Sequence, residues 1–405
     1  MQKIEGWVTA PQGFIAAGVK AGIKVSGNHD VAVIYSTAPA ACGAVFTQNK
    51  MCAAPVLVSR EVNQHGYAQA IVVNSGCANA CTGEQGLADA RKMQAHAAEL
   101  LGIKPEEVFV CSTGVIGQFL PMDKLLTGIA DAVDSLDECE GESCAMAIQT
   151  TDTFIKRAAY ETEIGGHKVK FAGIAKGAGM IHPNMATMLS FITTDANITA
   201  ACLKSALLWC VERTYNMLSV DGDTSTNDTV AILANGLCEN SRIENTDSEN
   251  YQKFCRALYK ICNYVVCMLA KDGEGATKLV LCEVNHAKTE EIAKTCAKSV
   301  IRSPLVKTAM FGSDANWGRV LCALGYAGAE IDVTKIDVSF VSAKGEIFVC
   351  RDGAGIEFSE EKAKEILLED EITIQVDLND GEFAATAYGC DLTYEYVKIN
   401  GDYRT

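Results

Sequence analysis

Residues 176–190 read KGAGMIHPNMATMLS and join a glycine-rich loop to a buried strand. The small residues after Lys176 leave the backbone few steric limits, and Pro183 disfavours helix at the residue before it. The apolar and β-branched run MLSFITT at 188–194 is typical of a core strand. Thr187 therefore lies where a bent loop enters the core, with its hydroxyl beside its own peptide bond.

A threonine in this position is a candidate for cutting its own chain. Its hydroxyl would attack the Ala186 carbonyl and convert the amide to an ester, which water would then release. The new chain would begin with Thr187, whose free α-amine can serve as the base for its own hydroxyl. The alternative interpretation is a glycine loop followed by a threonine that only packs or caps.

The segment KGAGMIHPNMATML resembles the processing motif of the ornithine acetyltransferase family, also called the glutamate N-acetyltransferases. The resemblance extends over the whole chain. Its further motifs are TAPQGF (9–14), AAPV (53–56), NSGCANACTG (74–83), STGVIGQFLPM (112–122), TTDT (150–153), VDGDTSTND (220–228), KDGEGATK (271–278) and GSDANWGRV (312–320). Two positions depart from the family pattern: Cys77 stands where asparagine is usual, and Ala315 stands where proline is usual.

This resemblance implies a layered α/β sandwich with a DmpA/ArgJ-like fold, of the self-processed N-terminal-nucleophile type. Cleavage between Ala186 and Thr187 would give an alpha chain of residues 1–186 and a beta chain of residues 187–405. Two such pairs would assemble into a heterotetramer. Independently of the family, the alternation of apolar runs with amphipathic segments indicates layers of strands and helices.

The apolar and amphipathic periodicity predicts the elements one by one. Strands are expected at 31–36, 70–74, 108–111, 168–175, 188–194, 229–234, 277–284, 336–350, 371–379 and 383–389. Helices are expected at 86–101, 123–133, 199–217, 248–270, 289–301 and 359–368, with another beginning near 318.

The composition favours an ordinary globular enzyme. A net charge of −16 argues against nucleic-acid binding, and 405 residues give room for two domains or one large two-part core. The 18 cysteines form no CxxC pair and no usual zinc spacing, which fits a reducing cytosol. No signal peptide or membrane-spanning run is visible in the sequence. We therefore expect a cytoplasmic protein without a metal.

Acyl transfer needs donors for the oxyanion that forms on the attacked carbonyl. Residues 112–114 (STG) follow an apolar strand, which puts a hydroxyl and backbone N–H groups at the end of that strand. Taken alone, this pattern also suits an ordinary turn. The family resemblance implies that Thr113 and Gly114 form the oxyanion hole.

The substrate-binding residues follow from the resemblance. It assigns substrate contacts to Thr153, Lys176, Thr187, Glu274, Asn400 and Thr405. Lys176 would pair with a carboxylate, and Glu274 with the ammonium group of ornithine. Without the resemblance, Lys176 would be interpreted as a solvated surface charge and Glu274 as part of a charged turn.

Two further segments would support this site. The C-terminal tail would be anchored by Tyr394, Tyr396 and Val397, against the usual tendency of chain ends to fray. The acidic run VDGDTSTND at 220–228 lacks the glycine and glutamate spacing of an EF-hand. We interpret it as a structural or site-supporting loop without a metal.

The activity implied by the family is transfer of acetyl from N2-acetylornithine to glutamate through an acetyl-Thr187 intermediate, with ping-pong kinetics, in arginine biosynthesis. Some members also take acetyl from acetyl-CoA, which would then be a substrate, and no resident cofactor is expected. Two alternatives remain open. One is a self-processing N-terminal-threonine amidase or aminopeptidase that passes the acyl group to water, and the other is a binding protein whose chain stays intact.

Overall fold

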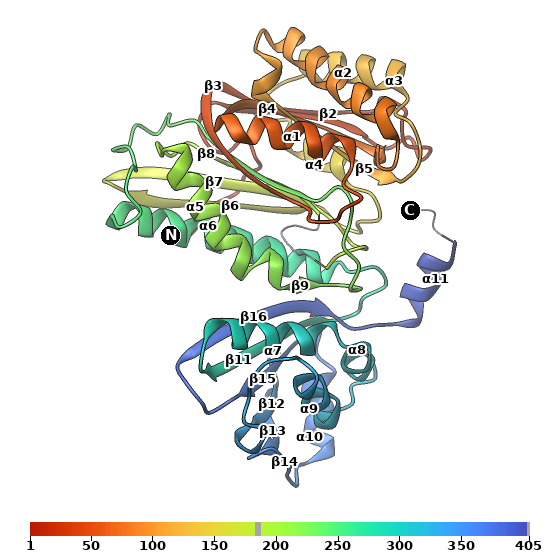
Figure 1. The fold of residues 1–405 in the computed structure, drawn as a ribbon, viewed down its shortest axis with the longest axis vertical. Helices are drawn as coiled ribbons and strands as arrows, with labels where there is room; N and C mark the ends of the chain where they lie inside the picture. The colour runs from red at the N-terminus through yellow and green to blue at the C-terminus, as the bar shows by residue number, and fades with distance from the viewer. Residues whose placement is uncertain (183–187, 403–405) are drawn as a thin grey trace.

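The computed structural model describes residues 1–182 and 188–402, and its chain forms two lobes (Figure 1). The larger lobe is built on a sheet with the strand order β1-β6-β7-β8-β10-β3-β4-β5, in which β2 also pairs with β3. Its strands are β1 (Gln2–Lys3), β2 (Phe14–Val19), β3 (Val31–Phe46), β4 (Tyr67–Cys77), β5 (Val108–Val115), β6 (Lys156–Ile164), β7 (His167–Lys176), β8 (Leu189–Thr194) and β10 (Thr229–Ala234).

The long strand β3 joins two halves of this sheet. Its residues 31–35 pair with β4, whereas residues 41–46 pair antiparallel with β10. The register shifts between Tyr35 and Ala40, which marks an irregularity between the two halves. The half made of β3, β4 and β5 packs against the half made of β7, β8 and β10, since Ile34 and Phe109 share one core cluster with Phe191.

The helices of this lobe are α1 (Ala54–His65), α2 (Gly83–Leu101), α3 (Met122–Asp134), α4 (Gly141–Ile148), α5 (Ala200–Arg213) and α6 (Glu249–Lys271). Helices cover both outer faces of the folded sheet, whereas α4 packs into the core cluster between its two halves. Met93 of α2 and Leu125 of α3 pack with Val72 of β4, while Phe254 of α6 packs with Ile192 of β8. The resulting order of helix, sheet, sheet and helix confirms the predicted layered α/β sandwich.

The smaller lobe carries a second sheet, with the strand order β14-β13-β12-β15-β11-β16-β9. Its strands are β9 (Leu218–Ser219), β11 (Leu279–Ala287), β12 (Asp337–Ser342), β13 (Gly345–Arg351), β14 (Ala354–Gly355), β15 (Glu371–Asp377) and β16 (Phe383–Cys390). Its helices are α7 (Glu290–Arg302), α8 (Pro304–Phe311), α9 (Trp317–Gly325) and α10 (Glu360–Leu367), and α11 (Tyr394–Asp402) follows β16.

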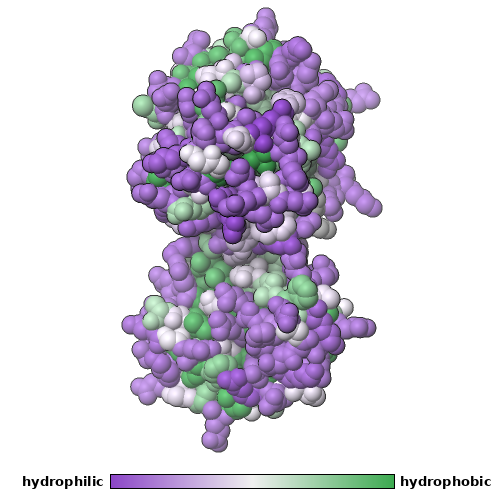
Figure 2. All heavy atoms as spheres, turned by 90° about the vertical axis from the view of Figure 1, so that its left-hand side faces the viewer, coloured by the Kyte–Doolittle hydropathy of each residue, from purple (hydrophilic) through white to green (hydrophobic). Residues whose placement is uncertain are grey.

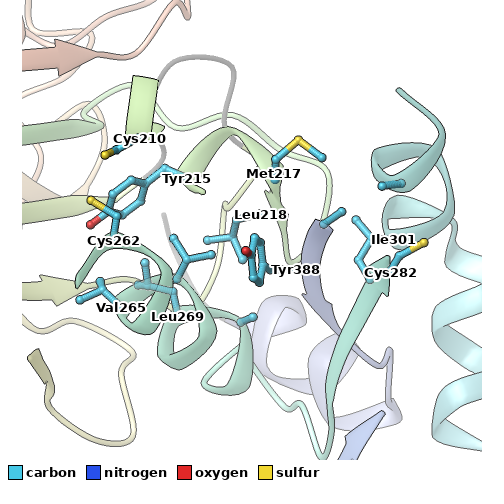
Figure 3. Packing of buried hydrophobic residues seen from close by; sticks show 14 of the residues in the cluster. Cys210, Tyr215, Met217, Leu218, Cys262, Val265, Leu269, Cys282, Ile301 and Tyr388 are labelled. Carbon is cyan, nitrogen blue, oxygen red and sulfur yellow. The ribbon is translucent and has the colours of Figure 1, made fainter. Parts of the chain in front are cut away.

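One continuous core ties the two lobes together. Leu269 of α6 packs in the same cluster as Leu218 of β9 and Tyr388 of β16 (Figure 3). The short strand β9 pairs parallel with β16, so the chain of the larger lobe contributes a strand to the smaller lobe. The face drawn in Figure 2 is mainly hydrophilic over both lobes. Among the described helices, none has the length and hydropathy to cross a membrane.

Local chemistry explains why the predicted helices form where they do. The Ser248 hydroxyl accepts a hydrogen bond from the Tyr251 N–H at the start of α6, which satisfies one of the free donors of a helix N-terminus. Phe254, Leu258 and Val265 then recur at helical spacing on its buried face.

Several predicted boundaries were wrong. The strands expected at 31–36, 70–74 and 108–111 are longer, at Val31–Phe46, Tyr67–Cys77 and Val108–Val115. The helix expected at 199–217 ends at Arg213, because Thr214 leaves helical geometry before a short 3-10 turn, η2 (Tyr215–Met217). The strand expected at 336–350 is a hairpin of β12 and β13 that turns at residues 343–344, and Gly345, which begins β13, has a φ of +112°. In addition, β2, β6, α1, α4, α8 and α11 were not predicted.

Candidate active site

A cavity of about 550 Å³ lies where strand ends of the larger lobe meet α11. It is lined by Asn49, Met51, Ala78, Cys81, Thr113, Gly114, Ile116, Thr150, Thr151, Lys176, Gly179, Met180, Asp221, Asp223, Thr224, Ser225, Thr226, Asn227, Glu274, Tyr396 and Asn400. The set includes five predicted site residues from four separate parts of the chain: Thr113, Gly114, Lys176, Glu274 and Asn400. Folding therefore brings these five to one cavity.

Thr113 and Gly114 lie inside β5, so the alternative of an ordinary turn is wrong for them. Gly114 has a φ of +128°, and a Cβ added there would lie 2.4 Å from the carbonyl carbon of Gly76. Only glycine suits this close approach between β4 and β5. The Thr113 hydroxyl accepts a hydrogen bond from Lys176 Nζ at 3.3 Å, which leaves its own proton free to be donated.

Lys176 ends β7 and is only 8% exposed, so it is no solvated surface charge. Burial lowers the pKa of its ammonium group, while the negative charges of Asp152, Asp228 and Glu274 oppose that shift. The ammonium group thus sits buried at the cavity wall, surrounded by carboxylates.

A buried network of charges lies behind Lys176. Lys156 Nζ contacts Asp152 Oδ1 at 2.6 Å and also bonds to Asp272. Asp152 in turn accepts the Gly177 N–H at 2.7 Å, just after Lys176. Burial would raise the pKa of Asp152, but the charges of Lys156 and Lys176 outweigh it and lower the pKa to about 2. Sequence reasoning missed this network, because Asp272 lies 116 residues from Lys156 in the chain.

Thr153 is held by that network and does not line the cavity. Its backbone N–H donates to Asp272 Oδ2 at 3.0 Å, and its hydroxyl also donates to Asp272. Its neighbours Thr150 and Thr151 are the residues of the TTDT motif that reach the cavity. The substrate contact predicted for Thr153 stays a prediction, and its observed partner is a protein carboxylate.

Glu274 and Asn400 meet at the other side of the cavity. Asn400 Nδ2 of α11 donates to Glu274 Oε2 at 2.8 Å, and the Glu274 N–H donates to Ala178 O at 2.8 Å. A Cβ on Gly179 would lie 2.3 Å from Glu274 Oε2. The Glu274 carboxylate can therefore lie against the loop only because residue 179 is glycine. Glu274 is 9% exposed and is not part of an open charged turn.

The three residues predicted to anchor the tail differ in their surroundings. Tyr396 lines the cavity, and the Tyr394 ring lies edge-on to the Phe311 ring of α8, with centroids 5.7 Å apart, although Tyr394 is 85% exposed. Val397 is 68% exposed, so the predicted anchor is not seen there. Tyr394 and Val397 lie two positions before and one position after Tyr396 on α11. At these spacings, helical side chains point in different directions, so the three residues have different surroundings.

The acidic loop at 220–228 holds the backbone that precedes the proposed cut. Asp221 accepts the N–H groups of Met180 and Ile181, at 2.6 and 2.9 Å. The Thr224 hydroxyl donates to His182 O at 2.8 Å. The Asp221 carboxylate thus binds backbone N–H groups, in agreement with a site-supporting loop.

Asn227 of the same loop joins it to the proposed oxyanion donors. Its Nδ2 donates to Ala78 O at 2.6 Å and to Ser112 O at 2.8 Å, directly before Thr113. In the described residues, no three His, Cys, Asp or Glu side chains gather as metal ligands.

The two departures from the family pattern lie in different places. Cys77 is buried at the end of β4, where its thiol donates to Gln118 O at 3.3 Å and burial raises its pKa. Ala315 is buried just before α9 in the smaller lobe, away from the cavity lining. Neither side chain enters the cavity.

Ala186, Thr187 and Thr405 lie outside the described residues. The two ends of the processing segment are nevertheless defined, because Lys176 and Leu189 face each other across the antiparallel pair of β7 and β8. The segment between them therefore starts at the cavity wall and returns beside it.

Comparison with known proteins agrees with the fold and the motifs. The profile of the ArgJ family matches residues 15–405. The chain is 53% identical over 405 residues to "Arginine biosynthesis bifunctional protein ArgJ" of Caldanaerobacter subterraneus subsp. tengcongensis, and 51% identical over 407 residues to that of Symbiobacterium thermophilum. Each match covers the whole of both chains.

A solved structure is also similar. The arginine biosynthesis bifunctional protein argJ of Bacillus halodurans is 44% identical with a TM-score of 0.51, and the match covers 54% of this chain and 100% of that chain. The family match over nearly all of the sequence and the relatives at about half identity over full length lead to one conclusion: the chain belongs to the ArgJ family.

Proposed function

We propose that this protein is a bifunctional acetyltransferase of arginine biosynthesis, which transfers acetyl from N2-acetylornithine to glutamate and also makes N-acetylglutamate from acetyl-CoA. The observation that carries the proposal is the shared cavity of Thr113, Gly114, Lys176, Glu274 and Asn400, with both ends of the processing segment beside it. Relatives at 51–53% identity over their full length bear the name of bifunctional arginine biosynthesis proteins.

Self-cleavage between Ala186 and Thr187 would create the nucleophile. It would divide the protein into residues 1–186 and residues 187–405. The second part makes up 219 of the 405 residues, or 54%, which equals the share covered by the complete chain of the Bacillus halodurans structure. That agreement in length supports the position of the cut.

The two parts would stay together after the cut because they share one sheet. β7 precedes the cut and β8 follows it, and the two pair along their length from Phe171 to Lys176. β10, also from the second part, pairs with β3 from the first. Separation would expose this buried core to water. By family resemblance, two such pairs would form a heterotetramer in the cytoplasm.

The transfer would proceed in two halves through Thr187. Its hydroxyl oxygen forms a bond to the acetyl carbonyl carbon, its α-amine takes the hydroxyl proton, and the carbon–nitrogen bond to ornithine breaks as ornithine leaves with a proton. The glutamate amine then attacks the acetyl ester, and Thr187 regains its proton. Thr113 and the Gly114 backbone would donate to the oxyanion in both halves.

The charges of the cavity suit these substrates. Lys176 would pair with the α-carboxylate that both substrates carry, and Glu274 with the side-chain ammonium of ornithine. Asn400 holds Glu274 in place by a hydrogen bond of 2.8 Å. No step requires a resident cofactor, since acetyl-CoA enters only as a donor.

An acceptor assay tests this proposal against a self-processing amidase. Purified protein is given N2-acetylornithine with and without glutamate, and acetate and N-acetylglutamate are quantified. We expect N-acetylglutamate only with glutamate, parallel double-reciprocal plots and suppression of acetate release by glutamate. Acetate release that glutamate does not change would contradict the transferase and favour the amidase.

A further inference from the structure

Asp228 carries a buried oxygen that the described structure leaves unpaired. The residue directly precedes β10 and is 2% exposed. Within residues 1–182 and 188–402, its Oδ2 is the buried side-chain atom without a hydrogen-bond partner. Native proteins seldom keep such an atom, because an unmet hydrogen bond in the interior is costly.

A small chamber beside the main cavity receives this carboxyl. Its volume is about 30 Å³, and its wall includes Asp228, Thr113, Lys176 and Met188. That volume admits a water molecule, and the carboxyl, hydroxyl and ammonium groups around it offer the polar partners a water needs. The chamber shares Thr113 and Lys176 with the main cavity, so it lies next to Thr113, one of the two proposed oxyanion donors.

The strand register brings Asp228 next to the proposed cut. β10 and β8 run parallel with Thr229 opposite Leu189, and the Thr229 N–H donates to Met188 O at 2.8 Å. The Met188 N–H in turn bonds to the Asp228 carboxyl. That N–H belongs to the peptide unit joining Thr187 to Met188, so the carboxyl is tied to the residue after the nucleophile.

We propose that Asp228 accepts a proton from the water that completes self-cleavage, with the small chamber as the place of that water. This inference rests on the function proposed above. After the Thr187 hydroxyl has displaced its own amine, Ala186 is held by an ester. The water oxygen bonds to the ester carbon and gives a proton to Asp228. The bond from that carbon to the Thr187 oxygen then breaks, and Asp228 returns the proton to this oxygen.

The electrostatics of the chamber suit a proton acceptor. Burial raises the pKa of Asp228 well above its usual range, while hydrogen bonds from Ser225 and Met188 and the positive charge of Lys176 oppose the shift. A carboxylate with a raised pKa takes a proton from water more readily than an exposed one. Asp221, in the same loop, differs because both of its oxygens are engaged by the backbone of Met180 and Ile181.

Hydroxylamine tests the inference, because at neutral pH it splits an ester and leaves an amide intact. Wild-type protein and the Asp228→Asn variant are followed from synthesis by denaturing mass spectrometry, with and without hydroxylamine. We expect the variant to finish cleavage at least ~10²-fold more slowly. Hydroxylamine should quickly split the ester that accumulates in the variant, which separates the two chains and leaves a hydroxamate on Ala186.

The matched control is Asp221→Asn, which makes the same change in the same loop. We expect it to slow formation of the ester, so that its uncut chain resists hydroxylamine. If Asp228→Asn is insoluble, Asp228→Ser gives the same test with a smaller side chain.

Two results overturn the role of Asp228 while leaving the proposed function intact: wild-type cleavage rate in the Asp228 variant, or a stalled variant that hydroxylamine does not split. Failure of the proposed function is recognised separately, because then the wild-type chain itself stays uncut between Ala186 and Thr187 and no Asp228 result supports the inference.

Discussion

Lys176 in the larger lobe and Lys278 in the smaller lobe are both buried, at 8% and 7% exposure, but their surroundings differ. Lys278 Nζ donates to Met310 O, Ser313 Oγ and Leu367 O at 2.8, 2.7 and 2.6 Å. Within the described residues, Lys176 Nζ makes a single hydrogen bond, to Thr113 at 3.3 Å, and faces the cavity.

The difference separates a structural charge from one suited to binding. An ammonium group has three donors, and Lys278 uses all of them to hold together α8, Ser313 just beyond α8 and the end of α10. Lys176 keeps donors available, and its charge is balanced by carboxylates around the cavity. A substrate carboxylate can therefore bind Lys176 without breaking a contact that holds the fold. Lys278 has no hydrogen-bond donor left for a substrate.

The largest effect on activity is expected from changing the proposed nucleophile, Thr187. This change tests whether the cavity beside Lys176 is a reaction site. We expect Thr187→Ala to abolish both chain cleavage and acetyl transfer, because one hydroxyl serves both reactions. Mass spectrometry and the acceptor assay measure the two losses, and Thr187→Ser should keep part of each. A Thr187→Ala protein that is cut and active would refute the mechanism.

Lys176→Met tests the binding side of the comparison. Removing one partner of a buried charge pair with the substrate should lower kcat/KM by ~10²-fold or more. Thermal unfolding should change far less than activity, and Lys176→Arg should recover part of the loss. An unchanged kcat/KM with either substrate would show that Lys176 is structural, like Lys278.

Lys278→Met is the matched change in the smaller lobe, and the opposite outcome is expected. Three oxygen acceptors would lose their donor, which should lower the free energy of unfolding by about 2–4 kcal/mol. In protein that remains folded, kcat/KM should stay within twofold or so of wild type. Denaturant unfolding and the acceptor assay measure both, and a selective loss of activity would break the comparison.

The smallest effect concerns acid stability. The pKa of Asp152 falls from its ordinary value of 3.8 to about 2 in the folded protein, so its ionised form stabilises the fold. That contribution is complete above the unfolded-state pKa and is lost as the pH falls through the folded-state value. It amounts to ~2 kcal/mol. Urea unfolding between pH 5 and 2 should show a shallower loss for Asp152→Asn, and equal slopes would contradict the assignment.

The sequence predicted most core elements because their hydrophobic pattern is strong. β10 matches its predicted range from Thr229 to Ala234, and α6 differs by one residue at each end. Helices such as α4 (GESCAMAI) were missed because a short run of small and polar residues has little hydrophobic periodicity. Such a helix forms where it packs against the rest of the lobe. Strand β6 was missed because KRAAYETEI is interrupted by charges.

The site was predictable where it lies within motifs and not where it depends on the fold. Thr113, Gly114, Lys176, Glu274 and Asn400 were predicted and share the cavity, although their roles stay proposals. The pairing of Lys156 with Asp272 spans 116 residues in the chain, and no local pattern indicates it. The unpaired oxygen of Asp228 likewise becomes visible only when strand register brings it beside Met188.

Intact mass under denaturing conditions tests the central claim most directly. The account predicts two chains from the 43.2 kDa sequence, with 186 and 219 residues, and an N-terminal threonine at position 187 on the second. A single species of the full mass, in protein that is folded and purified without inhibitor, would contradict the claim that Thr187 is released as the nucleophile.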